Sequence, residues 1–375
     1  MLPFFTEKFG NSGSVNHAFG WEARDAVDQS RQQIAAAIGA NEREIVFTSG
    51  ATESNNLAIR GVAERARRKG NHIVSVTTEH KAVLDPLAKL GRRDFDVTLL
   101  DVKPFADEQA GLLDPQQVAD VIRKDTILVS VMLANNEIGI IQPLAEIGKI
   151  CKRQGVLLHC DATQAVGKIA VDVEQLQVDL FSFTAHKIYG PKGIGALYVR
   201  RRTPHVKLES QLDGGSQEGG LRSGTLNVPG IVGFATAIKL CLDEMPVESE
   251  RLRMLRDDLW NKINRLVPQV ACNGPALTRH DLRLPGNLSV RFADVDGEAL
   301  MMSMRDVAVS SGSACTSANP EPSHVLRAIG LSEDLTRSSL RFGIGRFNTA
   351  EEIGFVANLV AEMVERLRGL GNRAT

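Results

Sequence analysis

The chain has 375 residues, and 44 lysines and arginines against 45 aspartates and glutamates give it a formal charge of −1. At about 150 residues per domain, this length predicts two or three domains. A hydrophobic fraction of 43% and a charged fraction of 24% are typical of an ordinary soluble globular protein. The balanced charge gives no electrostatic reason to expect a nucleic-acid or membrane partner.

The sequence also favours a particular compartment. No apolar run approaches the roughly 18 residues that a membrane-spanning helix needs, and residues 1–5 lack the basic region of a signal peptide. The five cysteines are odd in number and form no CxxC pair, which favours reduced thiols over disulfides and argues against a cysteine metal site. We therefore expect a cytoplasmic protein without a bound metal.

In the first part of the chain, short β-branched runs alternate with amphipathic helical patterns. Strands are expected at 44–48, 72–77, 96–100, 126–133, 156–160, 178–183 and 195–200. Helices are expected between them at 51–69, 81–90, 114–123 and 144–153. This alternation predicts the α/β class with a mainly parallel, doubly wound sheet. A long loop follows at 201–226.

The pattern changes after residue 246. A long charged helix is expected at 248–266, a strand at 287–292, and helices at 297–305 and 349–367. Strands and helices of this kind predict a smaller α+β domain. We therefore assign residues 1–246 to a large domain and 247–375 to a small C-terminal domain.

The candidate chemistry lies where the predicted strands end, because an open parallel sheet binds ligands at the carboxyl ends of its strands. The first strand runs into residues 48–53 (TSGATE), a turn of small residues that opens a helix. Its free N–H groups and the helix dipole are suited to a phosphate. The same residues are equally typical of a plain helix cap.

Other polar residues follow later strands, namely His80, Asn136, Asp161 and Lys187. Singly, they are typical of a surface histidine, a turn residue, a helix cap and a solvated lysine. Together at one edge of a sheet, they match the needs of pyridoxal phosphate, which takes a lysine for its covalent attachment and an acid for its pyridinium nitrogen. Because the chain has no GxxxxGK[ST] loop, a pyridoxal enzyme fits better than a nucleotide-binding one.

Motifs along nearly the whole chain resemble those of one enzyme family. They are FTSGATESNN (47–56), TEHKAVL (78–84), NNEIG (135–139), DATQAVG (161–167), AHKIYGPKG (185–193), LRSGT (221–225), SSGSACTS (310–317) and RFGIGR (341–346). In this order they resemble class-V, fold-type I pyridoxal phosphate enzymes and, more narrowly, the cysteine desulfurases of the NifS/IscS type. The resemblance implies that the large domain has the fold-type I architecture.

The resemblance also implies a role for each matching residue around the cofactor. Lys187 would form the covalent link to pyridoxal phosphate and shuttle protons, and His80 would stack on the ring. Asp161 would pair with the pyridinium nitrogen, and Gln164 would hydrogen-bond the phenolic oxygen.

The phosphate and the substrate would be held by further matching residues. The phosphate would be bound by Ala51, Thr52, Thr184 and His186. Thr225 would reach the same phosphate from the second subunit of a homodimer. Arg341 and Asn136 would bind the carboxylate of the substrate, because the planar fork of an arginine bonds a carboxylate bidentately.

Cys315 decides the reaction that the resemblance implies. A free cysteine is ordinarily buried and inert, but Cys315 lies among small polar residues. As in the family, its thiolate would attack the sulfur of L-cysteine, giving L-alanine and a persulfide on Cys315. The sulfur would then pass to an iron–sulfur scaffold or another acceptor protein. The other four cysteines are expected to be structural.

The match to the family is incomplete at the amino terminus, where the family's first strand has no counterpart. We expect the absence of that strand to lower stability or cofactor retention.

Two alternative functions remain open. One is another class-V enzyme that does not need Cys315, such as a selenocysteine lyase, a cystine lyase or an aminotransferase. The other is an impaired, truncated form that acts as a binding partner.

Overall fold

The computed structural model describes residues 1–203, 205–311 and 322–371. Packing divides the chain into two compact units. The first unit consists of Met1–Leu100, Pro115–Ala134 and Gln142–Met245, and the second of Asp101–Asp114, Asn135–Ile141 and Pro246–Thr375. The domain boundary at residue 246 remains a prediction. Packing adds two short segments, 101–114 and 135–141, to the second unit.

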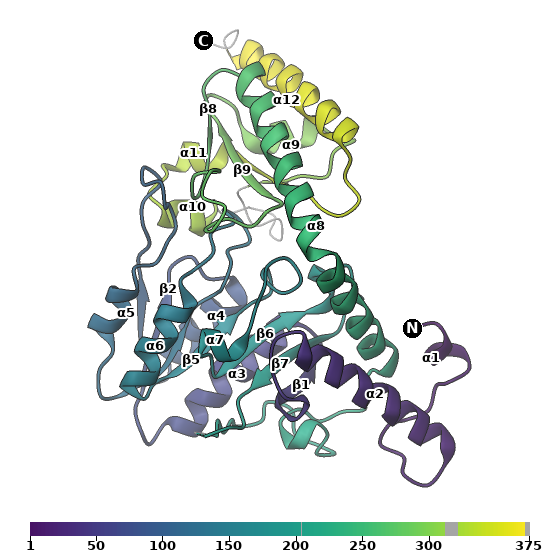
Figure 1. Cartoon of the computed structure of the whole chain (residues 1–375). Helices are drawn as coiled ribbons and strands as arrows, with labels where there is room; N and C mark the ends of the chain where they lie inside the picture. The colour runs from purple at the N-terminus through teal and green to yellow at the C-terminus, as the bar shows by residue number, and fades with distance from the viewer. Residues whose placement is uncertain (204, 312–321, 372–375) are drawn as a thin grey trace. The chain divides into compact units, whose positions relative to one another are not determined.

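The first unit is built on a seven-stranded sheet in the order β1-β7-β6-β5-β4-β2-β3 (Figure 1). Its strands are β1 (Ile45–Thr48), β2 (His72–Val76), β3 (Asp96–Leu100), β4 (Thr126–Ser130), β5 (Leu157–Asp161), β6 (Leu180–Thr184) and β7 (Gly195–Val199). Strands β3, β2, β4, β5 and β6 are parallel, and β7 runs antiparallel to both of its neighbours. This mainly parallel sheet confirms the predicted fold class.

One face of this sheet is covered by helices α3 (Ala51–Ala66) and α4 (Lys81–Gly91). The apolar residues of α3 recur at helical spacing, with Leu57, Ala58 and Val62 in the core beneath the helix. The other helices of the unit are α1 (Pro3–Thr6), α2 (Ala18–Ala36), α5 (Pro115–Val121), α6 (Leu144–Gln154) and α7 (Val173–Leu176).

The opposite face of the sheet receives the first part of α8 (Val228–Leu266). Phe234 of this helix packs on Phe183 of β6 with ring centroids 5.5 Å apart. The helix starts well before residue 248, so the predicted start there is wrong. Buried apolar residues continue the helical spacing upstream, including Ile231, Phe234 and Ile238.

The second unit contains an antiparallel sheet in the order β10-β11-β9-β8. Its strands are β8 (Val270–Cys272), β9 (Asn287–Phe292), β10 (Ser310–Ser311) and β11 (Ser339–Gly343). Its helices include α9 (Gly297–Ser303), α10 (His324–Ala328), α11 (Glu333–Arg337) and α12 (Ala350–Gly371). A separate apolar core joins β9 and β11 to α9 and α12, as expected for an α+β unit.

Among the described residues, no helix is both long enough and apolar enough to cross a bilayer.

Candidate active site

The predicted site residues of the first unit lie at the carboxyl edge of its parallel strands. There β5 ends at Asp161 and β6 at Thr184, and a 3₁₀ turn, η2 (Ala185–Lys187), follows directly. Helix α3 begins just beyond the end of β1. Ligands bind at this edge in open α/β sheets, so the sheet topology brings these residues together as expected.

The turn between β1 and α3 presents free backbone N–H groups. Gly50 occupies the N-cap with φ 155, a conformation that only glycine adopts without strain, and no side chain caps the helix. The neighbouring strand approaches closely, because a Cβ atom at Gly195 would lie 2.7 Å from the Gly50 Cα. The uncapped N–H groups and the helix dipole form a site for an anion.

The Thr184 hydroxyl, at the end of β6 just before the η2 turn, lies beside Gly50 of the anion site, because a Cβ atom at Gly50 would lie 3.7 Å from Thr184 Oγ1. Thr184 Oγ1 lies 3.0 Å from His186 Nδ1 and donates to the Ile194 carbonyl. Burial, followed by the neighbouring Lys187 and Lys192, lowers the pKa of His186, so its imidazole is neutral near pH 7. With the Thr184 hydrogen on Ile194, the neutral His186 ring donates to Thr184 Oγ1 through Nδ1–H. A hydroxyl rotates about its C–O bond, so Thr184 can donate to a phosphate oxygen in place of the Ile194 carbonyl. Lys187 itself is exposed.

Asp161 is held by donors on both carboxylate oxygens. Asn55 Nδ2 of α3 donates to Oδ2 at 2.7 Å, and the Thr163 N–H donates to Oδ1 at 3.0 Å. Asn55 is 0% and Asp161 5% exposed. Two donors therefore fix the Asp161 carboxylate, which can accept a hydrogen bond from a protonated ring nitrogen of a ligand.

Beneath Asp161 lies a buried polar row that sequence analysis did not assign to the site. His159, two residues earlier on β5, bridges Ser130 Oγ at 2.8 Å and Ser182 Oγ at 3.0 Å. Burial lowers the pKa of His159 to about 4, although the charge of Asp161 partly opposes this. His159 is therefore neutral, and its one signal in the sequence is a histidine inside an apolar strand.

A second buried carboxyl group accompanies Asp161. Glu79 is 0% exposed, and its Oε1 accepts from the Met132 N–H at 2.5 Å. Burial and then the charge of Asp161 raise the pKa of Glu79 well above its usual range. Both causes favour the neutral form of the Glu79 carboxyl group.

His80 and Gln164 also lie at this edge of the first unit, and both make local contacts. His80 is the N-cap of α4, where its Nδ1 accepts from the Ala82 N–H at 3.0 Å. With Nδ1 as the acceptor, the ring hydrogen lies on Nε2 and the orientation of the ring is fixed. Gln164 Oε1 accepts from Lys168 Nζ at 2.8 Å, which leaves its amide donor directed elsewhere.

The loop after β7 is held to the rest of the first unit by two ion pairs. Arg222 Nε lies 2.9 Å from Glu53 Oε1 in the first turn of α3. Glu218, with a side chain only 2% exposed, accepts two hydrogen bonds from Arg31 and one from the Phe47 N–H at 2.7 Å. Thr225 follows these anchors and is exposed.

The two predicted carboxylate-binding residues meet in the second unit. Arg341 Nη1 donates to the Asn136 carbonyl at 2.7 Å, and Nη2 donates to Ser310 Oγ at 3.0 Å. Among the described residues these bonds occupy two of the five N–H groups of the guanidinium. The contact with Asn136 is made through its backbone, so its side-chain amide is not used in holding Arg341.

Cys315 lies outside the described residues. The other four cysteines carry no disulfide; Cys151, Cys160 and Cys241 are buried and Cys272 is half-buried. Burial raises the pKa of Cys151 to about 12 and that of Cys160 well above its usual range. Such thiols are unreactive near pH 7.

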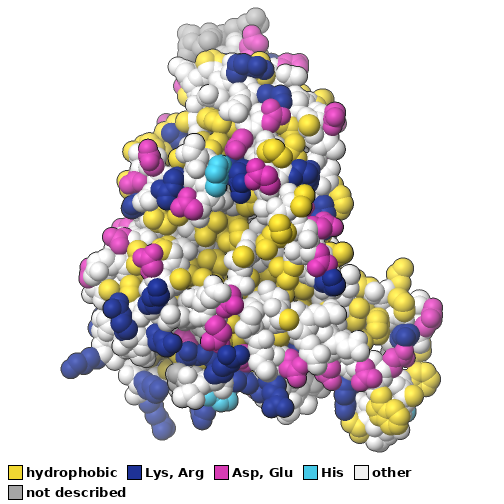
Figure 2. All heavy atoms as spheres, viewed as in Figure 1, with side chains coloured by type: hydrophobic (Ala, Val, Ile, Leu, Met, Phe, Trp, Pro, Cys, Tyr) yellow, Lys and Arg dark blue, Asp and Glu magenta, His cyan; other side chains and the backbone are white. Residues whose placement is uncertain are grey.

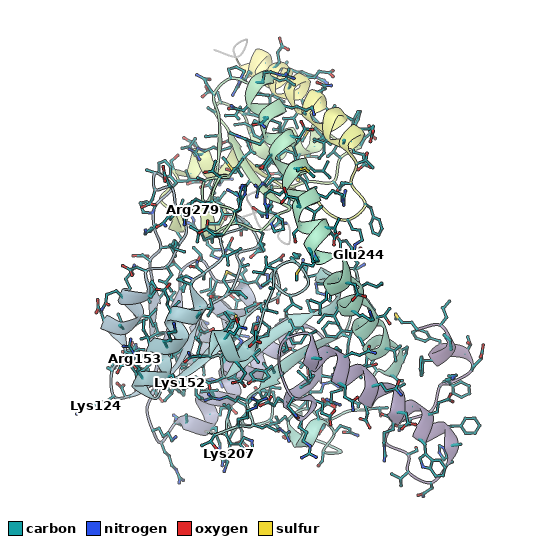
Figure 3. All side chains as sticks on the ribbon, viewed as in Figure 1. Lys124, Lys152, Arg153, Lys207, Glu244 and Arg279 are labelled. Atoms are coloured by element: carbon teal, nitrogen blue, oxygen red, sulfur yellow. The ribbon has the colours of Figure 1, made fainter. Side chains whose placement is uncertain are left out.

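One basic surface of the first unit lies away from the candidate site. Lys124 precedes β4, and Lys152 and Arg153 end α6 just before β5, so all three lie at the amino edge of the sheet. Figure 3 shows them with Lys207 on that side of the unit. This basic surface therefore contributes nothing to the anion site. In the part of the chain that is described, no cluster of three or more His, Cys, Asp and Glu residues is arranged to hold a metal ion.

The fold agrees with that of known proteins. The chain belongs to the class-V aminotransferase family, whose sequence profile matches residues 1–356.

Relatives within that family carry a more specific name. A protein named cysteine desulfurase IscS from Anaeromyxobacter sp. (strain Fw109-5) is 55% identical over 368 residues, covering 98% of this chain and 89% of the relative. One of the same name from Escherichia coli O139:H28 is 52% identical over 374 residues, covering 99% and 89%.

Solved structures give the same picture. A NifS-like protein matches with a TM-score of 0.88 at 34% identity, over 98% of this chain and 94% of that one. A structure of SspA in complex with cysteine matches with a TM-score of 0.79 at 36% identity, over 92% and 94%. These similarities confirm the predicted relationship to NifS/IscS-type enzymes of the cysteine desulfurase class.

Proposed function

We propose that this protein removes sulfur from L-cysteine with the help of pyridoxal phosphate, releasing L-alanine and leaving a persulfide on Cys315. The observation that carries the proposal is identity of 52–55% to proteins named cysteine desulfurase over nearly the full chain. The retained site chemistry supports it, because a protein used only for binding has no need of this set of groups.

The described residues fit pyridoxal phosphate. The uncapped start of α3 with Thr184 and His186 suits a phosphate. Asp161, anchored by Asn55, suits the pyridinium nitrogen, since a buried fixed carboxylate keeps that nitrogen protonated. When bound, the cofactor supplies an electron sink for bond cleavage next to the substrate amine.

The protein's own residues divide the remaining work. Lys187 would attach the cofactor and move protons at the substrate carbon, which suits an amine one residue from a phosphate-binding imidazole. The His80 ring, oriented by its cap bond, would stack on the cofactor ring. The amide donor of Gln164 would hydrogen-bond the phenolic oxygen, and Ala51 and Thr52 would bind the phosphate through their N–H groups.

Substrate recognition would depend on Arg341 and Asn136. The remaining N–H groups of Arg341 offer a bidentate site for the carboxylate of cysteine, and the Asn136 side chain offers a second donor. The structure of a relative, SspA, in complex with cysteine supports cysteine as the substrate of this chain.

Cys315 would accept the sulfur. Its thiolate forms a bond to the sulfur of the substrate while the substrate's Cβ–S bond breaks. The electron pair of that bond stays with the carbon, which takes up a proton and becomes the methyl group of alanine. No external oxidant or reductant is needed, because the sulfur leaves cysteine as a sulfane atom on Cys315.

A second copy of the chain is the partner that we propose. Apolar side chains gather over α1 and the start of α2 (Figure 2), where Leu2, Phe5, Phe9, Phe19 and Trp21 are exposed. An exposed apolar surface of this kind is typical of a subunit interface. In such a homodimer Thr225 would complete the phosphate site of the other subunit.

The wider setting that we propose is cytoplasmic. Free cysteines at every described position are consistent with a reducing compartment. A scaffold for iron–sulfur cluster assembly, or another acceptor protein, would take the sulfur from Cys315, as the name IscS of the relatives suggests.

The variant Cys315→Ala tests the proposal. We expect it to keep the visible absorbance of the bound cofactor and to lose alanine production from cysteine, while Cys272→Ala keeps both. A Cys315→Ala variant that still turns over cysteine would instead identify a lyase or an aminotransferase of the same family. A purified wild-type protein that binds no pyridoxal phosphate would indicate a binding partner and contradict the enzymatic proposal.

A further inference from the structure

A short turn of the second unit, residues 135–139, makes contacts with both sides of the segment that contains Cys315. On the amino side of that segment, Arg341 joins the turn to β10 by donating to the Asn136 carbonyl and to Ser310 Oγ. On its carboxyl side, Ser323 Oγ donates to the carboxylate of Glu137. A chain of hydrogen bonds thus runs from Ser310 through Arg341 and the turn to Ser323.

The bond to Glu137 has features that a chance surface contact lacks. Ser323 is 5% exposed, so its hydroxyl is shielded from water. The same oxygen is the N-cap of α10, where it accepts from the Leu326 N–H at 3.1 Å. A hydroxyl that donates to a carboxylate makes a charge-assisted bond, about twice as strong as a neutral one.

The backbone of Glu137 is itself fixed from two sides. Its N–H donates to Asn135 Oδ1 at 2.8 Å, and its carbonyl accepts from Asn287 Nδ2 at 3.2 Å. Arg283 supports Asn287 from beneath, because its buried guanidinium binds the carbonyls of Asn273, Pro275 and Asn287. The carboxylate of Glu137 therefore projects from a rigid base, as a positioning group requires.

We propose that Glu137 is a positioning residue for sulfur transfer. Through Ser323, it holds the chain on the carboxyl side of the Cys315 segment to the turn that supports Arg341. This inference rests on the proposed function of Cys315 as the sulfur acceptor. Its consequence is that the group binding the substrate carboxylate and the chain that carries the acceptor thiol share one support. Glu137 touches neither substrate nor cofactor in this proposal.

The test compares two steps in the holoenzyme, using Glu137→Ala, Ser323→Ala, their double variant, and Glu137→Gln. Titration of the cofactor absorbance with L-cysteine measures binding, and mass analysis of the Cys315 peptide in a single turnover measures persulfide formation. Ser332→Ala is the matched control, because Ser332 caps α11 through the Leu335 N–H just as Ser323 caps α10 but has no bond to Glu137.

We expect Glu137→Ala and Ser323→Ala each to slow persulfide formation about tenfold with little change in cysteine affinity, as the loss of one charge-assisted hydrogen bond predicts. The double variant should be no slower than either single one, because both remove the same bond. Glu137→Gln, whose amide oxygen still accepts the hydroxyl, should recover most of the rate, and Ser332→Ala should keep it.

Two results would overturn the inference. One is a Glu137→Ala variant that weakens cysteine binding but forms the persulfide at the normal saturated rate, which would assign Glu137 to the substrate pocket. The other is a Ser323→Ala variant that reacts like wild type; this single hydroxyl deletion keeps the test decisive if Glu137→Ala folds poorly. Failure of the wild-type protein to form any Cys315 persulfide would instead refute the proposed function itself.

Discussion

Replacing Asn55 with alanine is expected to weaken the binding of pyridoxal phosphate. The change deletes the 2.7 Å bond from Asn55 Nδ2 to Asp161 Oδ2 at a position that is 0% exposed, so no bulk water replaces the lost donor. A hydrogen bond to a charged group contributes about 1.5–3 kcal/mol. If that energy serves to fix the carboxylate for the pyridinium nitrogen, the dissociation constant of the cofactor rises about 10- to 100-fold.

The assay is a titration of the apoprotein with pyridoxal phosphate, followed by its absorbance, together with melting temperatures of the apo and holo forms. A purely structural loss lowers both melting temperatures equally, whereas loss of cofactor affinity narrows the gap between them. Asn71→Ala is the matched control, because Asn71 Nδ2 also makes one 2.8 Å bond but to the exposed Asp94 carbonyl. Cofactor affinity in Asn55→Ala within about twofold of wild type would refute the reasoning.

Three further expectations concern stability and reactivity. Burial lowers the pKa of His159 to about 4 from its ordinary value of 6.5. Between these two pH values the unfolded chain binds a proton at His159 and the folded chain does not. The free energy of unfolding therefore falls as the pH is lowered through this window. We expect the loss in the free energy of unfolding between pH 7 and pH 5 to be roughly 2 kcal/mol smaller in His159→Gln than in the wild-type protein. An equal loss in both proteins would contradict the burial argument. Glu218→Ala leaves Arg31 without its buried partner and should cost about 3–5 kcal/mol in a denaturant titration, whereas Glu174→Ala, which removes an exposed pair with Arg202, should cost under about 1 kcal/mol. Iodoacetamide at pH 8 should leave Cys151 and Cys160 of the native protein unmodified, and rapid labelling of either would show that its thiol is not shielded.

Local pattern was enough to locate most elements of the fold. The strand predicted at 287–292 coincides with β9, and the strand predicted at 96–100 coincides with β3. Both predictions succeed because a β-branched run bounded by turn residues predicts a strand together with its ends. The helix expected from 248 begins instead at Val228 and continues through Pro246. Proline and a rise in charge mark a boundary in a sequence, but apolar residues at helical spacing on both sides outweigh that signal.

The candidate site was predictable only in part. The strand-end rule found Asp161 and the turn before α3, because both follow from position along a strand. Asn55 and His159 were not assigned to the site, since an asparagine in a helix and a histidine in a strand gain meaning only through the groups opposite them. The packing of segments 101–114 and 135–141 with the second unit was likewise not predicted, because no pattern within these segments indicates a long-range contact.

The most direct test of sulfur transfer to Cys315 is a single turnover with L-cysteine in the absence of any reductant. The peptide containing Cys315 is then weighed by mass spectrometry, and the alanine released is measured in the same sample. We predict that this peptide gains one sulfur atom and that alanine appears in equal amount. Alanine without a modified Cys315 peptide would contradict the account, because sulfur would then leave by another route.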